Sequence, residues 1–300
     1  MTTTPARVSR TDTSAVEPRY LAALEAMRAG WWDSDNFDTW KTLYVSEYAR
    51  GFYVIDTLAK YVPAFSVQGA RVLDIGCGDA GVLIAFAERG STCAGIELDE
   101  KSLERGRLRA EEHGVRVDLR GGVAEALPWA DGSFDLVILD NVLEHVHDRE
   151  KTLAEIRRVL APGGLLYMVT PKPLSLYSLW NDPHYDLAGL VLMPRAMQIW
   201  YFEKVRGGGA GTYDVGVIPT RPTLRRMLKR AGFTVEVQPR ELWVHYLRNR
   251  IARPEEVRPG LKRTLASYFG TRRWPFHNPA MRWMWDVSVG SNFFIARRGP

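Results

Sequence analysis

The segment from Arg71 to Val82, RVLDIGCGDAGV, constrains the fold more than any other part of this 300-residue chain. Residues 71–75 form a short apolar run that ends at a glycine, which is typical of a buried parallel strand. Residues 80–89, AGVLIAFAER, follow with helical spacing. A strand, a glycine-rich turn and a helix in this order predict a nucleotide-binding loop, because glycines let the backbone approach a ligand at a helix N-terminus.

Strands and helices continue to alternate after this loop. Apolar runs predict six more strands, at 92–98, 115–120, 134–140, 165–170, 234–238 and 291–298. Segments with helical spacing lie between some of these runs, at 99–114, 149–160 and 220–232. The second of these helices is expected to stop at Pro162-Gly163-Gly164. The alternation predicts βαβ units and a parallel sheet with helices on both faces.

This alternation is interrupted twice, and the interruptions set the expected organisation of the chain. We expect one sheet with two inserted segments, since neither insert has the apolar residues for a core of its own. The expected parts are a disordered tail at 1–18, a helical segment at 19–65, a cofactor-binding core at 66–172, a cap insertion at 173–212, a helix and strand of the core at 213–239, a second insertion at 240–290 and the last strand at 291–300.

The composition predicts a globular protein, with 46% hydrophobic and 25% charged residues. No apolar run is long enough to predict a transmembrane helix, and the N-terminus lacks the apolar segment of a secretory signal. The two cysteines, Cys77 and Cys93, are too few for a disulfide framework. A reducing, cytoplasmic location is therefore expected.

Positive charge is concentrated near the C-terminus. Residues 221–300 contain 17 Lys and Arg against 5 Asp and Glu, together with 11 aromatic residues. A basic, aromatic region is typical of an anionic partner such as nucleic acid, a phosphorylated substrate or a membrane surface. A solvated basic face over an aromatic core accounts for the same composition, so composition alone leaves both interpretations open.

The glycines of the loop do not by themselves distinguish a dinucleotide from S-adenosylmethionine. Asp74 does, because a carboxylate there repels a pyrophosphate and attracts a sulfonium cofactor with a free amino group. Glu97, at the end of the second strand, can accept both hydroxyls of a ribose and suits either ligand. Gly81 completes the dinucleotide pattern but is interpreted as a residue of helix packing.

Four motifs in order resemble one known family. The motifs are VLDIGCG at 72–78, GIELD at 95–99, AEALPWADGSFDLV with LEHV at 124–146, and RVLAPGG at 158–164. Together they resemble the class I S-adenosylmethionine-dependent methyltransferases, in the small-molecule branch that includes the ubiquinone-biosynthesis O-methyltransferases. The resemblance covers about residues 70–172 and 212–233. We therefore expect a doubly wound, Rossmann-like α/β fold with a seven-stranded, mostly parallel sheet, an antiparallel last strand and lid insertions.

The resemblance implies how the methionine end of S-adenosylmethionine would be bound. Arg50 would hold its carboxylate, and Asp74 would contact its amino group through water. Either Asp140 or Asn141, at the end of the fourth strand, would lie beside it. The backbone under it would come from Gly76, Cys77 and Gly78.

The resemblance also implies how ribose and adenine would be bound. Glu97 would hold the ribose and Leu98 would pack on adenine. Ala124 would offer its backbone N–H to the ring, with Glu125 beside it. The family often has an acid where Val123 stands, so in this chain backbone and apolar contacts would read the adenine.

The segment 140–148, DNVLEHVHD, is the predicted place of catalysis, at the carboxyl edge of the sheet. In a helical conformation, Asn141, Glu144 and His145 would share one face. His145 would act as a general base, since its ordinary pKa is near neutral. The ubiquinone-biosynthesis relatives have a similar run and are associated with a divalent metal. Glu144 and His145 are thus candidate ligands for Mg²⁺, although Asn141 replaces an acid of that run.

Other candidate residues lie outside this segment. His184 in the cap insertion, near Trp180, Asp182 and Tyr185, is a second candidate catalytic or acceptor-binding residue. The same relatives share Trp31-Trp32-Asp33 and a Gly-Thr-x-Asp run at 211–214. His113 is expected only to cap the helix that it ends.

The sequence thus predicts an S-adenosylmethionine-dependent methyltransferase that methylates a hydroxyl of a small molecule. The aromatic lid predicts a hydrophobic or anionic acceptor, such as a natural product, sugar, quinone or lipid-linked intermediate. The apolar patch at 188–202 is interpreted alternatively as a contact with a membrane surface. The rival hypotheses are an RNA methyltransferase that uses the basic region and a non-catalytic S-adenosylmethionine-binding partner protein. No motif like Asn-Pro-Pro-Tyr follows the fourth strand, which argues against methylation of the exocyclic amines of nucleic acid bases.

Overall fold

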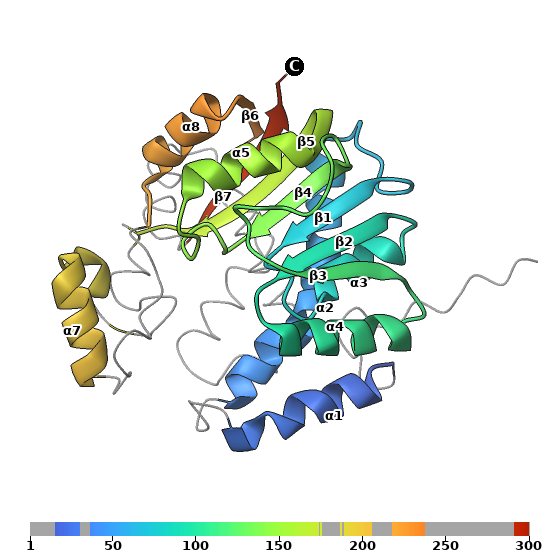
Figure 1. Cartoon of the computed structure of the whole chain (residues 1–300), viewed down its shortest axis with the longest axis horizontal. Coiled ribbons are helices and arrows are strands. Elements are labelled where there is room, and N and C mark those ends of the chain that lie inside the picture. Colours follow the sequence, from blue (N-terminus) through green and yellow to red (C-terminus); the bar gives the residue numbers. More distant parts are fainter. Residues whose placement is uncertain are drawn as a thin grey trace, which may run out of the picture.

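A computed structural model describes residues 16–30, 37–173, 175, 187, 189–205, 218–237 and 291–299. Its central element is a seven-stranded sheet with helices on both faces (Figure 1). The strands are β1 (Arg71–Ile75), β2 (Thr92–Glu97), β3 (Val117–Gly121), β4 (Phe134–Asp140), β5 (Leu160–Pro171), β6 (Phe233–Val237) and β7 (Ser291–Arg298). All seven predicted strands are therefore present.

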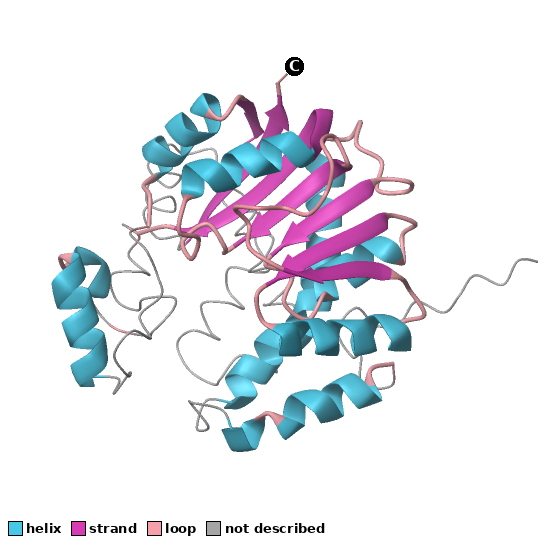
Figure 2. Cartoon of the chain, viewed as in Figure 1, coloured by secondary structure: helices cyan, strands magenta, loops and turns pink. Residues whose placement is uncertain are grey.

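The helices of the described residues alternate with these strands (Figure 2). The α-helices are α1 (Pro18–Ala26), α2 (Phe37–Tyr61), α3 (Gly81–Ala87), α4 (Glu100–Glu112), α5 (Arg149–Val159), α7 (Arg195–Val205) and α8 (Arg221–Arg230). Two short 3-10 helices also occur, η1 (Arg28–Gly30) and η3 (Leu190–Leu192). Helix α1 begins at Pro18, and the preceding Glu17 is buried.

The strand order is β3-β2-β1-β4-β5-β7-β6, in which β1 pairs in parallel with both β2 and β4. The last strand, β7, runs antiparallel between β5 and β6, which confirms the expected topology. The chain changes winding direction between β1 and β4. In open α/β sheets a ligand binds at such a switch point, outside the carboxyl ends of the strands.

Two apolar layers cover the sheet, because successive residues of each strand point to opposite faces. In β4, Leu136 and Ile138 face the layer that contains α2 and α3, whereas Val137 and Leu139 face α5 and α8. The long helix α2 crosses α3 at Gly51, where a Cβ atom would lie 2.6 Å from the Cβ atom of Ala85. This close crossing brings the middle of α2 over the start of α3.

One predicted element boundary is wrong at β5. The turn expected at Pro162-Gly163-Gly164 lies inside the strand, which begins directly after α5 at Leu160. The register with β4 shifts between Phe134 and Leu136, so the extra residues of β5 form an irregularity. Gly163 has a φ of +76°, a conformation that glycine adopts without strain.

No helix of the described ranges is long and apolar enough to cross a membrane.

Candidate active site

The glycine loop between β1 and α3 is tightly enclosed on two sides. Gly76 and Gly78 have φ values of +71° and +51°. A Cβ atom on Gly76 would lie 2.4 Å from a methyl carbon of Val142, and one on Gly78 would lie 3.0 Å from Glu47 Oε1. The loop therefore requires glycine both for its backbone conformation and for the space around it.

Gly81 serves packing, as the sequence analysis proposed. A Cβ atom there would approach the Cβ of Glu47 and the backbone nitrogen of Tyr48, both to 2.7 Å. The third glycine of the dinucleotide pattern thus lets α2 pack on α3.

Buried acids surround an arginine at the ends of β1 and β4. Arg50, on α2, lies 3.4 Å from Asp140 Oδ2 and 3.7 Å from Glu47 Oε1. Burial raises the pKa of Asp74 well above its usual range, and Arg50 opposes that rise. Burial likewise raises the pKa of Asp140. The structure thus brings the predicted residues Arg50, Asp74 and Asp140 into one electrostatic group, although α2 and β4 are far apart in sequence.

Glu97 lies at the end of β2 and is hydrogen-bonded to backbone N–H groups. Leu98 and Asp99 donate to Oε1 at 2.7 and 3.2 Å, and Gly78 donates to Oε2 at 3.1 Å. These bonds hold the carboxylate against the glycine loop. Oε1 already accepts two bonds and Oε2 one, so a lone pair of Oε2 is left to accept from a ribose hydroxyl.

The residues predicted to contact adenine differ in how exposed they are to solvent. Leu98 is 75% exposed and Val123 is 40% exposed, so both offer apolar surface, whereas Ala124 is buried. Glu125 accepts hydrogen bonds from the backbone N–H groups of His147 and Asp148 at 2.8 and 3.1 Å. Glu125 thus fixes the segment after β4, a contact that sequence reasoning did not predict.

The helix considered over 140–148 is absent. Asn141 has a φ of +57°, in the left-handed region, and residues 143–145 form a turn. Asp148 then caps α5 by accepting from Lys151 N–H at 2.9 Å. The left-handed residue prevents helical continuation, so Glu144 and His145 do not share a face: Glu144 is buried and His145 is exposed.

This turn offers no set of ligands for Mg²⁺ among the residues that the structure describes. No group of three or more His, Cys, Asp or Glu side chains there could hold a metal ion. Asn141 instead donates through Nδ2 to Asp140 Oδ1 at 2.9 Å. The expected pair of Glu144 and His145 therefore does not fit a chelating site, and no chemical step is derived through a metal.

Comparison with known proteins agrees with this geometry. A methyltransferase-domain family matches residues 73–168. The ubiquinone biosynthesis O-methyltransferase of Sinorhizobium medicae is 31% identical over 168 residues, which cover 54% of this chain and 67% of that protein. The chain belongs to the class I S-adenosylmethionine-dependent methyltransferases.

Two further proteins are similar to this methyltransferase. The ubiquinone biosynthesis O-methyltransferase of Cereibacter sphaeroides is 33% identical over 163 residues, 53% of this chain and 65% of that protein. The chain thus spans slightly less than two thirds of that relative. An S-adenosylmethionine-dependent methyltransferase structure from Mesorhizobium loti has a TM-score of 0.50 at 22% identity, covering 77% of this chain and 92% of that one, and shares the fold.

S-adenosylmethionine is the cofactor of this family, and the donor set of the methyltransferase suits it. The buried Asp74 and the half-buried Asp140 complement an ammonium and a sulfonium, and Arg50 complements a carboxylate. The glycine loop leaves backbone surface that a side chain would fill. The ammonium, the sulfonium and the carboxylate of the cofactor thus each have a side chain of opposite charge at this edge of the sheet.

Cys77 does not point its side chain toward this edge. Its Sγ lies 2.6 Å from where a Cβ atom on Gly95 would stand, inside the apolar layer. Burial raises the pKa of the Cys77 thiol well above its ordinary value. Only the backbone of Cys77 is available for the role expected of it.

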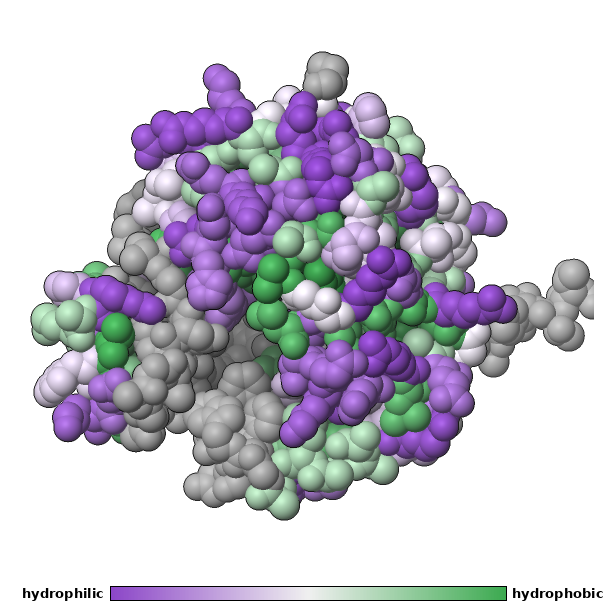
Figure 3. Space-filling view, in the orientation of Figure 1, coloured by the Kyte–Doolittle hydropathy of each residue, from purple (hydrophilic) through white to green (hydrophobic). Residues whose placement is uncertain are grey.

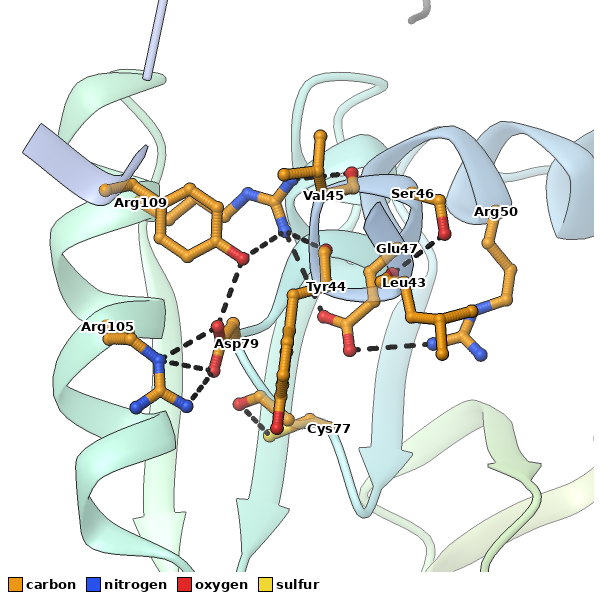
Figure 4. Close-up of polar contacts among 12 residues, drawn as sticks. Leu43, Tyr44, Val45, Ser46, Glu47, Arg50, Cys77, Asp79, Arg105 and Arg109 are labelled. Carbon is orange, nitrogen blue, oxygen red and sulfur yellow. Dashed lines mark hydrogen bonds and ion pairs between the residues drawn. The ribbon is translucent and has the colours of Figure 1, made fainter. Parts of the chain in front are cut away.

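Sequence reasoning missed Glu47 and Asp79. Glu47 lies one helical turn before Arg50 on α2, and this spacing could have revealed it. Asp79 is fully buried and accepts from Arg105 and from the hydroxyl of Tyr20 (Figure 4). Nothing in the loop sequence distinguishes Asp79 from an exposed turn residue.

His113 is more than the helix cap that was expected. Its two ring nitrogens lie 2.8 Å from carboxylate oxygens of Glu17 and Glu88, and its side chain is buried. Burial lowers the pKa of His113, but the hydrogen bonds to both acids outweigh this effect and raise it to about 9.

Several predicted features lie outside the described residues. They are Trp31-Trp32-Asp33, His184 with its polar and aromatic neighbours, the run at 211–214 and most of both insertions.

Proposed function

We propose that this protein is an O-methyltransferase that moves the methyl group of S-adenosylmethionine to a hydroxyl of a small molecule. The observation that carries the proposal is the group of buried acids around Arg50, next to a glycine loop at the switch point of the sheet. Family membership supports the cofactor, and the names of the curated relatives support oxygen as the acceptor atom.

We assign the methionine end of the cofactor to residues of α2, β1 and β4. Arg50 would bind the carboxylate, and Asp74 with Asp140 or Asn141 would surround the amino group. The backbone of the loop from Gly76 to Gly78 would pass beneath. When bound, S-adenosylmethionine supplies a methyl group activated by a positively charged sulfur.

We assign ribose and adenine to the ends of β2 and β3. Glu97 would accept from a ribose hydroxyl with the lone pair of Oε2 that its backbone hydrogen bonds leave over. The exposed Leu98 and Val123 would cover the adenine ring, and the backbone N–H of Ala124 would donate to it. No side-chain acid is available at Val123, so the adenine amino group would be read by backbone alone.

We propose His145 as the general base for the acceptor hydroxyl. Methyl transfer is an in-line displacement, so the protein mainly aligns the two reactants and excludes water, and a base takes the hydroxyl proton. The exposed His145 lies on the turn after β4, beside the proposed cofactor site. His184, in the cap insertion, remains the second candidate for this role.

Replacing His145 tests this assignment. His145→Ala should lower the rate of methyl transfer by a factor of about 100 or more, with cofactor affinity nearly unchanged. Incorporation of tritiated methyl groups into a panel of catechols, hydroquinones and sugars measures the rate, and calorimetry measures the affinity. His147→Ala, two residues along the same turn, is the matched control. Full activity of His145→Ala would show that another residue is the general base.

We propose a hydrophobic acceptor, either a quinone-like or lipid-linked intermediate or an aromatic natural product. The exposed apolar side chains of η3 and α7 support this choice, and Figure 3 shows them mixed with charged residues at the left of the view. They are Leu192, Met197, Trp200 and Val205, each more than half exposed. This surface also supports peripheral contact with a membrane that holds such an acceptor.

The membrane contact has its own test. Co-sedimentation with vesicles of phosphatidylglycerol should fall several-fold when Met197 and Trp200 are both replaced by Ser. The same pair of changes should leave S-adenosylmethionine affinity unchanged. Equal sedimentation of the wild type and the double variant would show that this surface does not bind the membrane.

A binding experiment tests the function as a whole. Calorimetry should detect S-adenosylmethionine binding and no NAD binding; the reverse result would overturn the proposal. Methyl incorporation into RNA would favour the RNA methyltransferase, and cofactor binding without any methylated product would favour a non-catalytic partner. A cytoplasmic location is proposed with it, in agreement with the free thiols of Cys77 and Cys93.

A further inference from the structure

Glu47 brings a further carboxylate to the edge of the proposed cofactor site. It lies on α2 with Oε1 3.7 Å from Arg50 and Oε2 3.9 Å from Arg109, and the N–H of Gly81 donates to it (Figure 4). Oε1 would stand 3.0 Å from a Cβ atom on Gly78. The carboxylate therefore lies directly over the glycine loop.

The charges in this region do not balance. Glu47, Asp74, Asp140 and Glu97 all contribute to the electrostatics of the site, and Arg50 is the cation that faces the first three. Arg109 is 3.9 Å from Glu47, but it forms its closer ion pair with the buried Glu17. Carboxyl groups thus outnumber guanidinium groups here, in a region where burial raises the pKa values of Glu47, Asp74 and Asp140 and weakens screening.

The reaction changes the charge of the cofactor by one unit. S-adenosylmethionine carries a sulfonium, and loss of its methyl group leaves a neutral thioether in S-adenosylhomocysteine. The two molecules share the amino acid, ribose and adenine groups, so contacts to those groups do not distinguish them. The carboxylate of Glu47 does, because its charge adds an attraction to the sulfonium that the neutral thioether lacks.

We propose that Glu47 makes this site select the sulfonium form of the cofactor over its thioether product. The inference rests on the proposed function and adds to it a residue that favours entry of cofactor and departure of product. Because Glu47 also caps the start of α3, a purely structural role must give a different result. Loss of a structural contact would weaken both ligands alike, whereas loss of charge weakens S-adenosylmethionine selectively.

The test compares two ligands on three proteins. Calorimetry at pH 8 measures the dissociation constants of S-adenosylmethionine and S-adenosylhomocysteine for the wild type, Glu47→Gln and Glu25→Gln. Glu47→Gln should weaken S-adenosylmethionine about tenfold and S-adenosylhomocysteine by less than about twofold. Glu25 is exposed on α1 and pairs with Lys41, so Glu25→Gln removes the same charge and should change neither constant.

Equal weakening of both ligands by Glu47→Gln, or no change in either, would overturn the inference. Failure of the wild type to bind either ligand would instead overturn the proposed function. Thermal unfolding of the free proteins identifies any loss of affinity caused by misfolding.

The selectivity should also depend on pH. Burial raises the pKa of Glu47 to about 7, against the opposing charge of Arg50. The other groups that face it are Cys77 and Asp79 of the loop, Arg109 of α4, Tyr20 of α1, Tyr44 of α2 and Asp74 of β1. Ionisation of Glu47 between about pH 6 and pH 8 should raise the ratio of the two affinities in the wild type. A ratio that rises equally in Glu47→Gln would assign the pH dependence to another group.

Discussion

Two neighbouring groups of charged side chains, linked by the 3.9 Å contact between Arg109 and Glu47, are built differently. One, which we call the α1 network, joins α1 to α4 and to the glycine loop and contains three acids and three bases: Glu17, Asp79, Glu88, Arg105, Arg109 and His113. The other, the acidic cluster of Glu47, Asp74, Glu97 and Asp140, has Arg50 at its centre.

The two groups differ in how closely their charges are paired within the chain. In the α1 network each charge has a close partner, such as the Arg105–Asp79 pair at 2.8 Å, so burial is compensated within the chain. In the acidic cluster one arginine is shared at longer distances, since Arg50 lies 3.4 Å from Asp140 and 3.7 Å from Glu47, so a cationic ligand would complete the group. Burial raises the pKa values of Asp74 and Asp140, as it does that of Asp79 in the α1 network. Neutralising a charge should therefore have opposite effects in the two groups.

The largest expected effect is in the α1 network. Arg109 is fully buried and pairs with Glu17, which is also fully buried. Arg109→Met should lower the free energy of unfolding by about 3 kcal/mol or more, because it leaves Glu17 without its main partner. Urea denaturation followed by circular dichroism measures the change.

The matched control lies on the same helix. Arg107 is half exposed and pairs with the exposed Glu100. Arg107→Met should change the free energy of unfolding by no more than about 0.5 kcal/mol. Similar effects of the two substitutions would show that burial does not distinguish the pairs.

His113 gives the α1 network a pH dependence of opposite sign to that of a paired acid. Its pKa is raised to about 9 in the folded protein, above the ordinary value of about 6.5. The stabilisation is therefore complete below pH 6.5 and is lost as pH rises through 9, by at most about 3 kcal/mol. Urea denaturation at pH 6, 7.5 and 9 should show this fall, and His113→Gln should reduce it. An unchanged slope in His113→Gln would assign the effect elsewhere.

The smallest expected effect on stability is in the acidic cluster and has the other sign. Asp74→Asn replaces a carboxyl group, whose ionisation burial disfavours, by a neutral amide, so the free protein should become more stable at pH 7 by about 1 kcal/mol. Affinity for S-adenosylmethionine should fall about tenfold or more, because the ammonium loses its partner. Thermal unfolding and calorimetry measure the two quantities. Destabilisation of the free protein would show that the cluster is compensated like the α1 network.

Local patterns predicted most of the fold. Strand β1 was predicted at Arg71–Ile75 and β4 at Phe134–Asp140, with the bounds that the structure has, because apolar runs that end at glycine or at acids are local signals. The boundary at Leu160 and the turn after β4 were not predicted, because both depend on pairing with neighbouring strands and on one left-handed residue, Asn141.

The sequence by itself determined the alternating fold, the glycine loop and the acids at the ends of β1, β2 and β4. Each of these features depends on the pattern of a few consecutive residues. Only the tertiary structure decided which charges meet. Arg50 and Glu47 reach the acidic cluster because α2 crosses α3 at Gly51 and Gly81, and His113 becomes a buried cation because α1 delivers Glu17 to it. Such contacts join residues tens of positions apart, so their energies follow from packing rather than from any local pattern.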